Sequence, residues 1–321
     1  MSNIKSESLM STGGVWFPRA ASKEALHADH LYSFILWGSV LLFVGIMVAV
    51  GWFIYKFKRT PQNQVASGQI VHNDRLEITW TILPLILCVI IFAWGYKGYL
   101  KMTVPPENAT EIRVTGKQWL WQFTYPDGTT SVGELVVPVN VPIKFIMTSE
   151  DVIHSFFIPN FRIKKDVIPN RYTRTWFEAT STGNFQIFCT EFCGNAHSDM
   201  LAIARVVTKE DYKKWLKDVN NVDDIPLDKL GERVYTAKGC NACHSLDGSP
   251  KTGPSWKGIY GKSHKMTNGQ SVQVDDNYIR ESILEPQAKI VAGYQPIMPA
   301  FKGVLKDREI EAIIEYIKKV K

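Results

Sequence analysis

Two cysteines, a histidine and a methionine lie within 12 residues of one another in the segment CTEFCGNAHSDM, as Cys189, Cys193, His197 and Met200. A second histidine, His154, lies 35 residues upstream. Thiolate and imidazole together select copper, zinc or iron–sulfur clusters. The thioether argues against zinc, whose usual ligands are cysteine, histidine and carboxylate. We therefore predict a copper site, and the second cysteine favours a binuclear centre with bridging thiolates. The alternative is a disulfide between the two cysteines.

The sequence CNACH at residues 240–244 is a second candidate site. A C-x-x-C-H motif attaches c-type haem, with Cys240 and Cys243 forming the thioethers and His244 binding the iron. The alternative is a redox or disulfide pair beside an idle histidine.

A sixth haem ligand is expected nearer the C-terminus. The first candidate is Met298, in the sequence YQPIMPAF. Methionine–histidine ligation raises the reduction potential and suits electron transfer. Met266 and His264 are the competing candidates, and we interpret both as ordinary loop residues.

Two uncharged apolar segments precede both sites. Residues 31–55 carry no charge over 25 positions, and residues 78–96 carry none over 19. About 20 apolar residues cross the hydrocarbon core as a helix, so each segment can span a membrane. The alternative, a pair of buried helices, is rare for uncharged segments of this length. We predict a transmembrane hairpin over residues 31–99, with spans at about 31–55 and 78–97.

The charges beside the first span predict its orientation. Lys56, Lys58 and Arg59 follow it directly, and such positive clusters stay on the cytoplasmic side. Residues 1–30 and everything after the hairpin are then expected on the extracytoplasmic side. Residues 1–30 lack the apolar stretch of a cleavable signal peptide, so the first span is expected to direct export.

The exported part divides into two predicted domains. Residues 100–207 contain short β-branched and aromatic runs separated by turn residues, a spacing typical of a β-sandwich. Residues 208–227 form a connecting segment with a helix-like stretch, KEDYKKWLKDV. Residues 228–321 predict a small all-α domain around CNACH, because apolar residues recur at helical spacing near its end: Ile310, Ile313, Ile314 and Ile317.

The net charge of +6, from 37 Lys and Arg against 31 Asp and Glu, does not indicate nucleic acid as a partner. No segment combines a stripe of basic residues with interleaved aromatics. The fifth cysteine, Cys88, lies inside the second span and is expected to be inert.

The pattern H…C-x-E-x-C-G-x-x-H-x-x-M after two spans resembles subunit II of haem–copper cytochrome oxidases, over residues 31–207. With CNACH, the whole chain resembles a subunit II fused to a class I cytochrome c domain, as in bacterial caa-type oxidases. The resemblance implies a cupredoxin-like fold and the binuclear copper centre called CuA. It implies as ligands the backbone carbonyl of Glu191 and five side chains: His154, Cys189, Cys193, His197 and Met200. The Glu191 carboxylate would face a Mg²⁺ site shared with subunit I.

Two further segments match the family. GKQWLWQF resembles the aromatic segment whose first tryptophan, Trp119, receives electrons from cytochrome c, although Leu120 stands where the family often has an aromatic. Trp121 and Phe123 alternate along the same run and are expected to pack in a core. RLEITWTILP resembles the entry of the second span, which implies that Glu77 lies at the cytoplasmic mouth of a proton pathway into subunit I.

The resemblance implies a respiratory terminal oxidase of the bacterial inner membrane. Electrons from cytochrome c or a quinol-oxidising complex would enter at haem c and pass through CuA to subunit I, where O₂ is reduced to water and protons are pumped. The expected partners are subunit I, other oxidase subunits and membrane lipid. Because the copper ligands are present, quinol itself is not the expected direct donor. Two alternatives are the electron-entry subunit of a CuA-containing nitric oxide reductase and a membrane-tethered electron carrier without an oxidase core.

Overall fold

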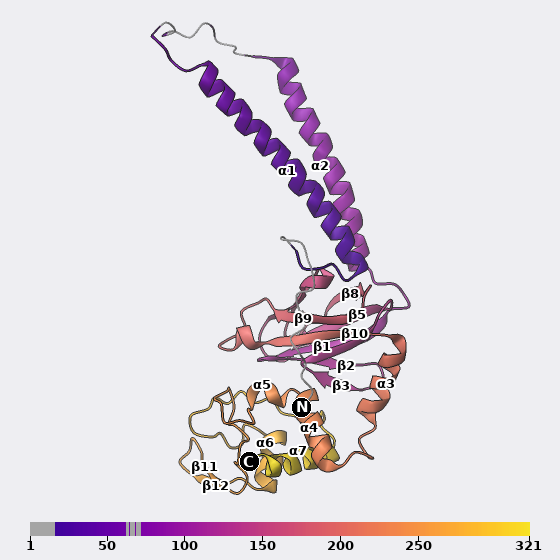
Figure 1. Ribbon diagram of the computed structural model, residues 1–321, viewed down its shortest axis with the longest axis vertical. Coiled ribbons are helices and arrows are strands. Elements are labelled where there is room, and N and C mark those ends of the chain that lie inside the picture. Colours follow the sequence, from indigo (N-terminus) through magenta and orange to yellow (C-terminus); the bar gives the residue numbers. More distant parts are fainter. Residues whose placement is uncertain (1–16, 62–63, 65–67, 69–71) are drawn as a thin grey trace. The chain divides into compact units, whose positions relative to one another are not determined.

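The computed structural model describes residues 17–61, 64, 68 and 72–321 (Figure 1). Parts of the predicted N-terminal segment and of the loop between the spans therefore lie outside the described residues. The chain divides into two compact units. One is the helical pair Lys23–Val104, and the other is Pro105–Lys321 together with the N-terminal segment that ends at Ser22.

The two uncharged segments form the long helices α1 (Lys23–Lys56) and α2 (Asp74–Thr103). Both helices extend beyond the predicted spans, because backbone hydrogen bonding continues into the flanking polar residues. Most of the large apolar side chains of both helices are exposed, as expected of surfaces that face lipid. Pro84 lies inside α2, and Phe34 of α1 contacts Trp94 of α2 with ring centroids 5.5 Å apart.

The predicted β-sandwich consists of two five-stranded sheets. The first has the order β3-β2-β1-β5-β8, with β1 and β5 parallel. Its strands are β1 (Thr110–Lys117), β2 (Leu120–Thr124), β3 (Thr130–Val132), β5 (Pro142–Ser149) and β8 (Thr173–Glu178). The second has the order β4-β10-β9-β6-β7, with β4 and β10 parallel. Its strands are β4 (Glu134–Pro138), β6 (His154–Ile158), β7 (Ile163–Val167), β9 (Gly183–Cys189) and β10 (Leu201–Val207).

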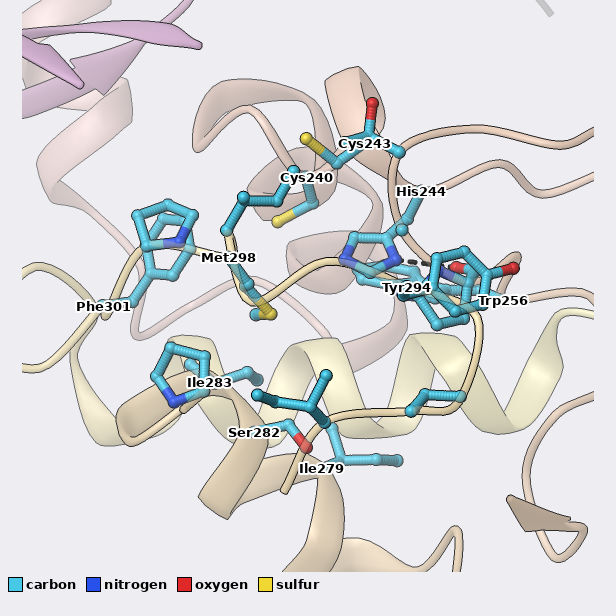
Figure 2. A pocket seen from close by; sticks show the side chains of 18 of the residues that line it. Cys240, Cys243, His244, Trp256, Ile279, Ser282, Ile283, Tyr294, Met298 and Phe301 are labelled. Atoms are coloured by element: carbon cyan, nitrogen blue, oxygen red, sulfur yellow. Dashed lines mark hydrogen bonds between the residues drawn. The ribbon is translucent and has the colours of Figure 1, made fainter. Parts of the chain in front are cut away.

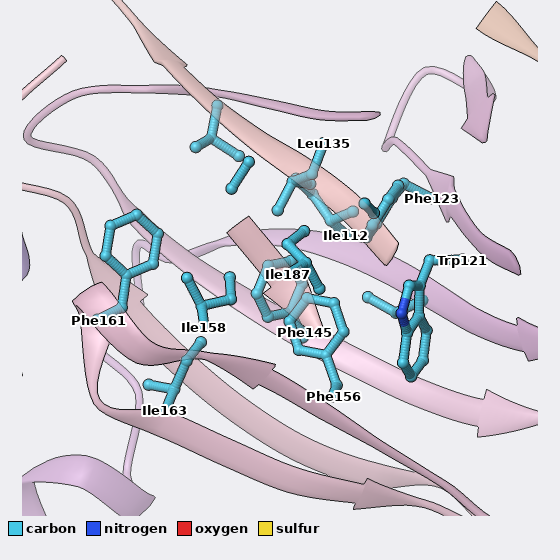
Figure 3. Packing of buried hydrophobic residues seen from close by; sticks show 14 of the residues in the cluster. Ile112, Trp121, Phe123, Leu135, Phe145, Phe156, Ile158, Phe161, Ile163 and Ile187 are labelled. Atoms are coloured by element: carbon cyan, nitrogen blue, oxygen red, sulfur yellow. The ribbon is translucent and has the colours of Figure 1, made fainter. Parts of the chain in front are cut away.

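Aromatic side chains fill the space between the two sheets (Figure 3). Phe156 of β6 lies at the centre, with its ring centroid 5.2 Å from Trp121 and 5.3 Å from Phe145. Edge-to-face contacts at these distances are favourable for aromatic pairs. Trp121 and Phe123 are fully buried, as predicted from their alternation along β2. This packed core makes the inner face of each sheet rigid. The strand ends that carry the sulfur and imidazole ligands extend from these rigid sheets.

Residues 17–22, which we call the N-terminal strap, pack on the sandwich. The Ala21 amide donates to the Asn160 carbonyl, and the Ala21 carbonyl accepts from the Thr180 amide, both at 2.9 Å. The Ser22 hydroxyl donates to the Phe161 carbonyl at 3.0 Å. Ala21 and Ser22 are fully buried, so the strap is an integral part of the sandwich.

The predicted helix-like stretch after the sandwich is α3 (Lys209–Asn220), capped by the Thr208 hydroxyl. Its residues Tyr212 and Trp215 pack against the sandwich core. The next residues are bound instead to the C-terminal domain, because the Arg308 guanidinium donates to three carbonyls at 3.0–3.1 Å: Val222, Asp223 and Ile225.

The C-terminal domain is mainly helical, as predicted. Its elements are α4 (Leu227–Ala237), α5 (Cys240–Cys243), the hairpin β11 (Ser263–Lys265) and β12 (Ser271–Gln273), α6 (Asp276–Leu284) and α7 (Asp307–Lys319). α4 crosses α7 at Gly231, where a Cβ atom would lie 2.1 Å from the Ala312 carbonyl oxygen. Only glycine permits so close an approach. The predicted isoleucines of α7 are buried in the core of this domain.

Candidate metal and haem sites

The five candidate ligands with sulfur or imidazole side chains come together at one end of the strands of the second sheet. His154 begins β6, and Cys189 ends the neighbouring strand β9. The loop that follows β9 carries Cys193, and a short 3₁₀ turn (His197–Asp199) leads to Met200 before β10. Hydrogen bonding of β6 to β9 therefore fixes two of the ligands, and the loop between β9 and β10 supplies the other three.

The ligand atoms surround the pair of cysteine sulfurs. The two Sγ atoms lie 3.8 Å apart. Cys189 Sγ is 3.9 Å from Nδ1 of His154 and 3.3 Å from the carbonyl oxygen of Glu191. Cys193 Sγ is 3.4 Å from Nδ1 of His197 and 3.8 Å from Sδ of Met200. Each sulfur thus has one imidazole nitrogen and one weaker donor beside it.

This arrangement fits a binuclear copper site. Both cysteines are free thiols, with a sulfur separation far longer than a disulfide bond of about 2.05 Å. Burial raises the pKa of the Cys189 thiol, but hydrogen bonds with His154 and the Ser155 backbone outweigh it and lower that pKa below its ordinary value. Burial and the adjacent Cys189 raise the pKa of Cys193. A bound cation would stabilise both sulfurs as thiolates, and soft sulfur with imidazole suits copper.

These contacts do not support the Mg²⁺ site that was expected at the Glu191 carboxylate. Among the described residues, the group of histidine, cysteine and acidic side chains close enough to share a metal is His154, Cys189 and Cys193. Glu191 faces this group with its backbone carbonyl, and its side chain is exposed.

The turn between β1 and β2 closes over the sulfur pair. The Gln118 side-chain amide donates to the Cys193 carbonyl at 2.7 Å, and the Trp119 indole Nε1 donates to the same oxygen at 3.1 Å. At Gly194 a Cβ atom would lie 2.9 Å from the Trp119 ring. Trp119 therefore contacts the metal-binding loop directly. Gln118 was not among the residues predicted from the sequence, and its position beside Trp119 is the one signal that could have identified it.

The C-terminal domain contains a cavity that is partly open to solvent. Cys240, Cys243, His244 and Met298 all line it (Figure 2). Its other walls are largely apolar and include Ile279, Ile283, Phe301, Leu305, Ile313 and Ile317. Three residues of the β1–β2 turn region also line it: Gln118, Trp119 and Leu120. An apolar cavity beside a C-x-x-C-H motif fits a covalently attached haem.

The His244 ring is held in the orientation that haem ligation needs. Its Nδ1–H donates to the Pro254 carbonyl at 2.7 Å, which leaves Nε2 to bind iron (Figure 2). A Cβ atom at Gly253 would lie 2.7 Å from the ring, so only glycine fits there. Burial lowers the pKa of His244, which favours the neutral imidazole that binds a metal.

Two of the three candidates for the sixth ligand, Met298 and His264, line the cavity. Met298 lines the cavity, and the Gln287 side-chain amide donates to the carbonyls of Pro296 and Met298 at 2.9 and 3.4 Å. Met266 is buried but is not part of the cavity lining. His264 lines the cavity and lies in the short strand β11, where we expected a loop. The geometry favours Met298 as the thioether donor.

Glu77 lies apart from both sites, in the first turn of α2. Its carboxylate is 3.0 Å from Nδ1 of His72, whose other ring nitrogen contacts Asp74. All three side chains are exposed.

A paired-sulfur metal site on a β-sandwich, a cytochrome c cavity and two apolar helices define a membrane-anchored electron-transfer protein. Family models agree with each part. The transmembrane domain of cytochrome c oxidase subunit II matches residues 10–97, and its periplasmic domain matches residues 131–207. The cytochrome c model matches residues 229–321. The chain belongs to the cytochrome c oxidase subunit II family and carries a C-terminal cytochrome c domain.

Two relatives support this assignment, and one solved structure is also similar to part of the chain. Cytochrome c oxidase subunit 2 of Alkalihalophilus pseudofirmus is 28% identical over 95% of this chain and 90% of its own length. A probable cytochrome c oxidase subunit 2 of Rickettsia bellii is 31% identical over 64% of this chain and 83% of its own length. The solved periplasmic domain of subunit II (CoxB) of Bradyrhizobium japonicum is 36% identical, covers 36% of this chain and 96% of that one, and gives a TM-score of 0.35.

The family assignment confirms the resemblance and the fold class deduced from the sequence. The chain is a membrane protein with two spans, and it is a subunit of a haem–copper oxidase, an oxidoreductase complex. As a subunit II with its own cytochrome c domain, it has an electron-entry role, with subunit I and other oxidase subunits as partners.

Proposed function

We propose that this chain accepts electrons at its cytochrome c domain and delivers them, by way of the Cys189–Cys193 site, to subunit I of the oxidase. There O₂ is reduced to water with proton pumping. The residues that would hold the haem are Cys240, Cys243, His244 and Met298. Those that would hold the copper pair are His154, Cys189, Cys193, His197 and Met200, with the carbonyl of Glu191. When bound, these groups supply reversible one-electron chemistry.

One side chain carries the proposal. Trp119 lines the cavity that contains His244 and Met298, and its indole donates to the carbonyl of Cys193. The same residue therefore touches both candidate redox sites. An aromatic ring in that position shortens the through-bond path between the sites, and the hydrogen bond to Cys193 holds the ring in place.

The protein's own contribution is to position ligands and exclude water. His154, Cys189, Cys193 and Met200 are buried. A buried site on a rigid sandwich changes its geometry little between oxidation states, which favours fast electron transfer. The covalent attachment predicted at Cys240 and Cys243, and the fusion of the two domains, replace a diffusional encounter with a high effective concentration.

The remaining assignments concern the membrane. We place residues 17–22 and both redox domains on the extracytoplasmic side of a bacterial inner membrane, because Lys56, Lys58 and Arg59 follow the first span. In this orientation Glu77, with His72 beside it, lies on the cytoplasmic side. We propose that it serves there as a proton entrance. The exposed Glu191 side chain remains free to meet subunit I, where Mg²⁺ would be shared. Cytochrome c or a quinol-oxidising complex is the proposed donor.

The test is rapid reduction of the intact, purified oxidase by a donor that reduces haem c, with haem and copper followed by their separate absorption bands. Haem c is expected to be reduced first and copper second. Trp119→Phe should slow the second phase severalfold and leave the first unchanged. Copper reduced before haem c, or no effect of Trp119→Phe, would contradict the proposed route.

A further inference from the structure

Asp151 lies in the turn between β5 and β6, three residues before His154, and its carboxylate is 30% exposed. Nothing in the sequence marked it as functional. Its Oδ1 atom lies 2.8 Å from Nε2 of His154 and also accepts from the Val152 amide at 2.6 Å and the Ser149 hydroxyl at 3.2 Å. Its Oδ2 atom accepts from the Gln118 backbone amide at 2.7 Å.

The first contact sets the orientation of a metal ligand. When the Nε2 proton of His154 is donated to Asp151, Nδ1 is left with its lone pair facing Cys189 Sγ, 3.9 Å away. Histidine ligands are commonly held in this way by a carboxylate on the other ring nitrogen, which fixes the tautomer and increases the basicity of the ring. His154 is fully buried, so water cannot replace this partner.

The second contact fixes the turn that carries the electron-entry tryptophan. The Gln118 amide bound by Oδ2 directly precedes Trp119. The side chains of Gln118 and Trp119 in turn donate to the Cys193 carbonyl, at 2.7 and 3.1 Å. One carboxylate therefore ties His154, on one side of the sulfur pair, to the turn that closes over Cys193 on the other.

We infer that Asp151 is a positioning residue that fixes the His154 imidazole for copper and holds the Trp119 turn against the same centre. The inference rests on the proposed copper-binding function of the site. It predicts that a change at Asp151 alters the metal centre and the turn together, because both depend on the two oxygens of one side chain.

Asp151→Asn tests the inference with little change of shape. An amide presents oxygen on one side only, so its NH₂ group must face either the Gln118 amide or the donors on the Oδ1 side, which are His154 Nε2–H, the Val152 amide and the Ser149 hydroxyl. In the first case the tie to the Trp119 turn is lost, and in the second the tie to His154 is lost. Glu150→Gln is the matched control. It removes the same charge one residue away, from a side chain that pairs with Lys117 at 2.7 Å and does not contact His154.

The first measurement uses the purified full-length chain in detergent, loaded with copper by titration against a competing chelator. Asp151→Asn should weaken copper binding by about 10–100-fold, the range typical for loss of such a partner. It should also change the copper hyperfine pattern in the electron paramagnetic resonance spectrum. The midpoint potential should rise, because a less basic imidazole stabilises the oxidised metal less. Glu150→Gln should leave all three unchanged.

The second measurement uses the copper-free chain. Hydrogen–deuterium exchange at the amides of the β1–β2 turn should be faster in Asp151→Asn than in the wild type or Glu150→Gln. Unchanged copper affinity, spectrum and exchange in Asp151→Asn would overturn the inference about Asp151. Failure of the wild-type chain to bind two coppers would instead overturn the proposed function, which separates the two outcomes.

Discussion

Lys238 and Glu309 form a buried ion pair, with 3.7 Å between Nζ and Oε1 and side chains only 8% and 9% exposed. The same ammonium donates to the carbonyl and the hydroxyl of Thr130, at 3.2 and 3.0 Å. Burial lowers the pKa of Lys238, which Glu309 partly offsets. Because Lys238 lies two residues before Cys240, the pair holds the start of the haem-attachment segment.

Glu309→Gln should destabilise the protein, because it replaces the carboxylate that neutralises the buried Lys238 charge with an uncharged amide. Removing one member of a buried ion pair costs about 3–5 kcal/mol, and we expect a value near the lower end. Chemical unfolding followed through the haem absorption measures the effect. Glu311→Gln, on the exposed face of the same helix, should cost less than about 0.5 kcal/mol. Equal effects of the two variants would show that the buried pair has no special role.

Cys193→Ser should abolish the binuclear copper signature, because one bridging thiolate is replaced by a hydroxyl that copper binds weakly. Metal analysis of the purified oxidase should then give less than two coppers at this site, and its electron paramagnetic resonance spectrum should lose the pattern of one electron shared by two coppers. Cys88→Ser, in α2, is the control and should leave both unchanged. Retention of the shared-electron pattern in Cys193→Ser would exclude this cysteine as a bridge.

Met298→Leu should keep the covalent haem but remove its sixth ligand. The absorption band of methionine–iron ligation should disappear, and the midpoint potential should fall. Met266→Leu should keep both properties, at a cost of less than about 1.5 kcal/mol in stability for a volume-conserving change in the core. Loss of the band in Met266→Leu and not in Met298→Leu would reverse the assignment.

Asp166 should contribute a pH-dependent part of the stability. A hydrogen bond from the buried Ser155 hydroxyl, followed by the charge of Lys164, holds the pKa of Asp166 below its ordinary value of 3.8. Above pH 3.8 the carboxylate stabilises the folded state, and this contribution is lost as the pH falls through the lowered pKa, because the unfolded chain is protonated first. Asp166→Asn should therefore unfold at a lower temperature at pH 7, with a difference from wild type that shrinks below pH 3.8. A pH-independent difference between Asp166→Asn and the wild type would refute the linkage.

The helices and strands could be predicted from the sequence better than the pairing of one strand with another. The two helices and the strands of the sandwich follow from local apolar patterns, which appear in any short window of sequence. The parallel pairing of β1 with β5 and of β4 with β10 does not, because it depends on contacts between distant segments. The helix ends were also missed, since α1 begins at Lys23, well before the apolar segment.

The same limit applies to the sites. Cys189, His197 and Met298 could be proposed as ligands from the sequence, because few residue types bind copper or haem iron. Asp151 and Gln118 could not, because a carboxylate and an amide are common on any surface. Their roles depend on two separate turns. The β5–β6 turn brings Asp151 within 2.8 Å of His154, and the β1–β2 turn brings Gln118 within 2.7 Å of the Cys193 carbonyl.

The N-terminal strap has a consequence for the order of biosynthesis. Ser22 and Phe161, joined by a hydrogen bond, are 139 positions apart, with both spans between them. The ribosome makes Ser22 first, but its acceptor exists only after the hairpin and most of the sandwich have been synthesised. The strap can dock only when both spans have been inserted so that the chain returns to the side where it started. The strap contacts of the sandwich therefore form last, after both spans have crossed the membrane.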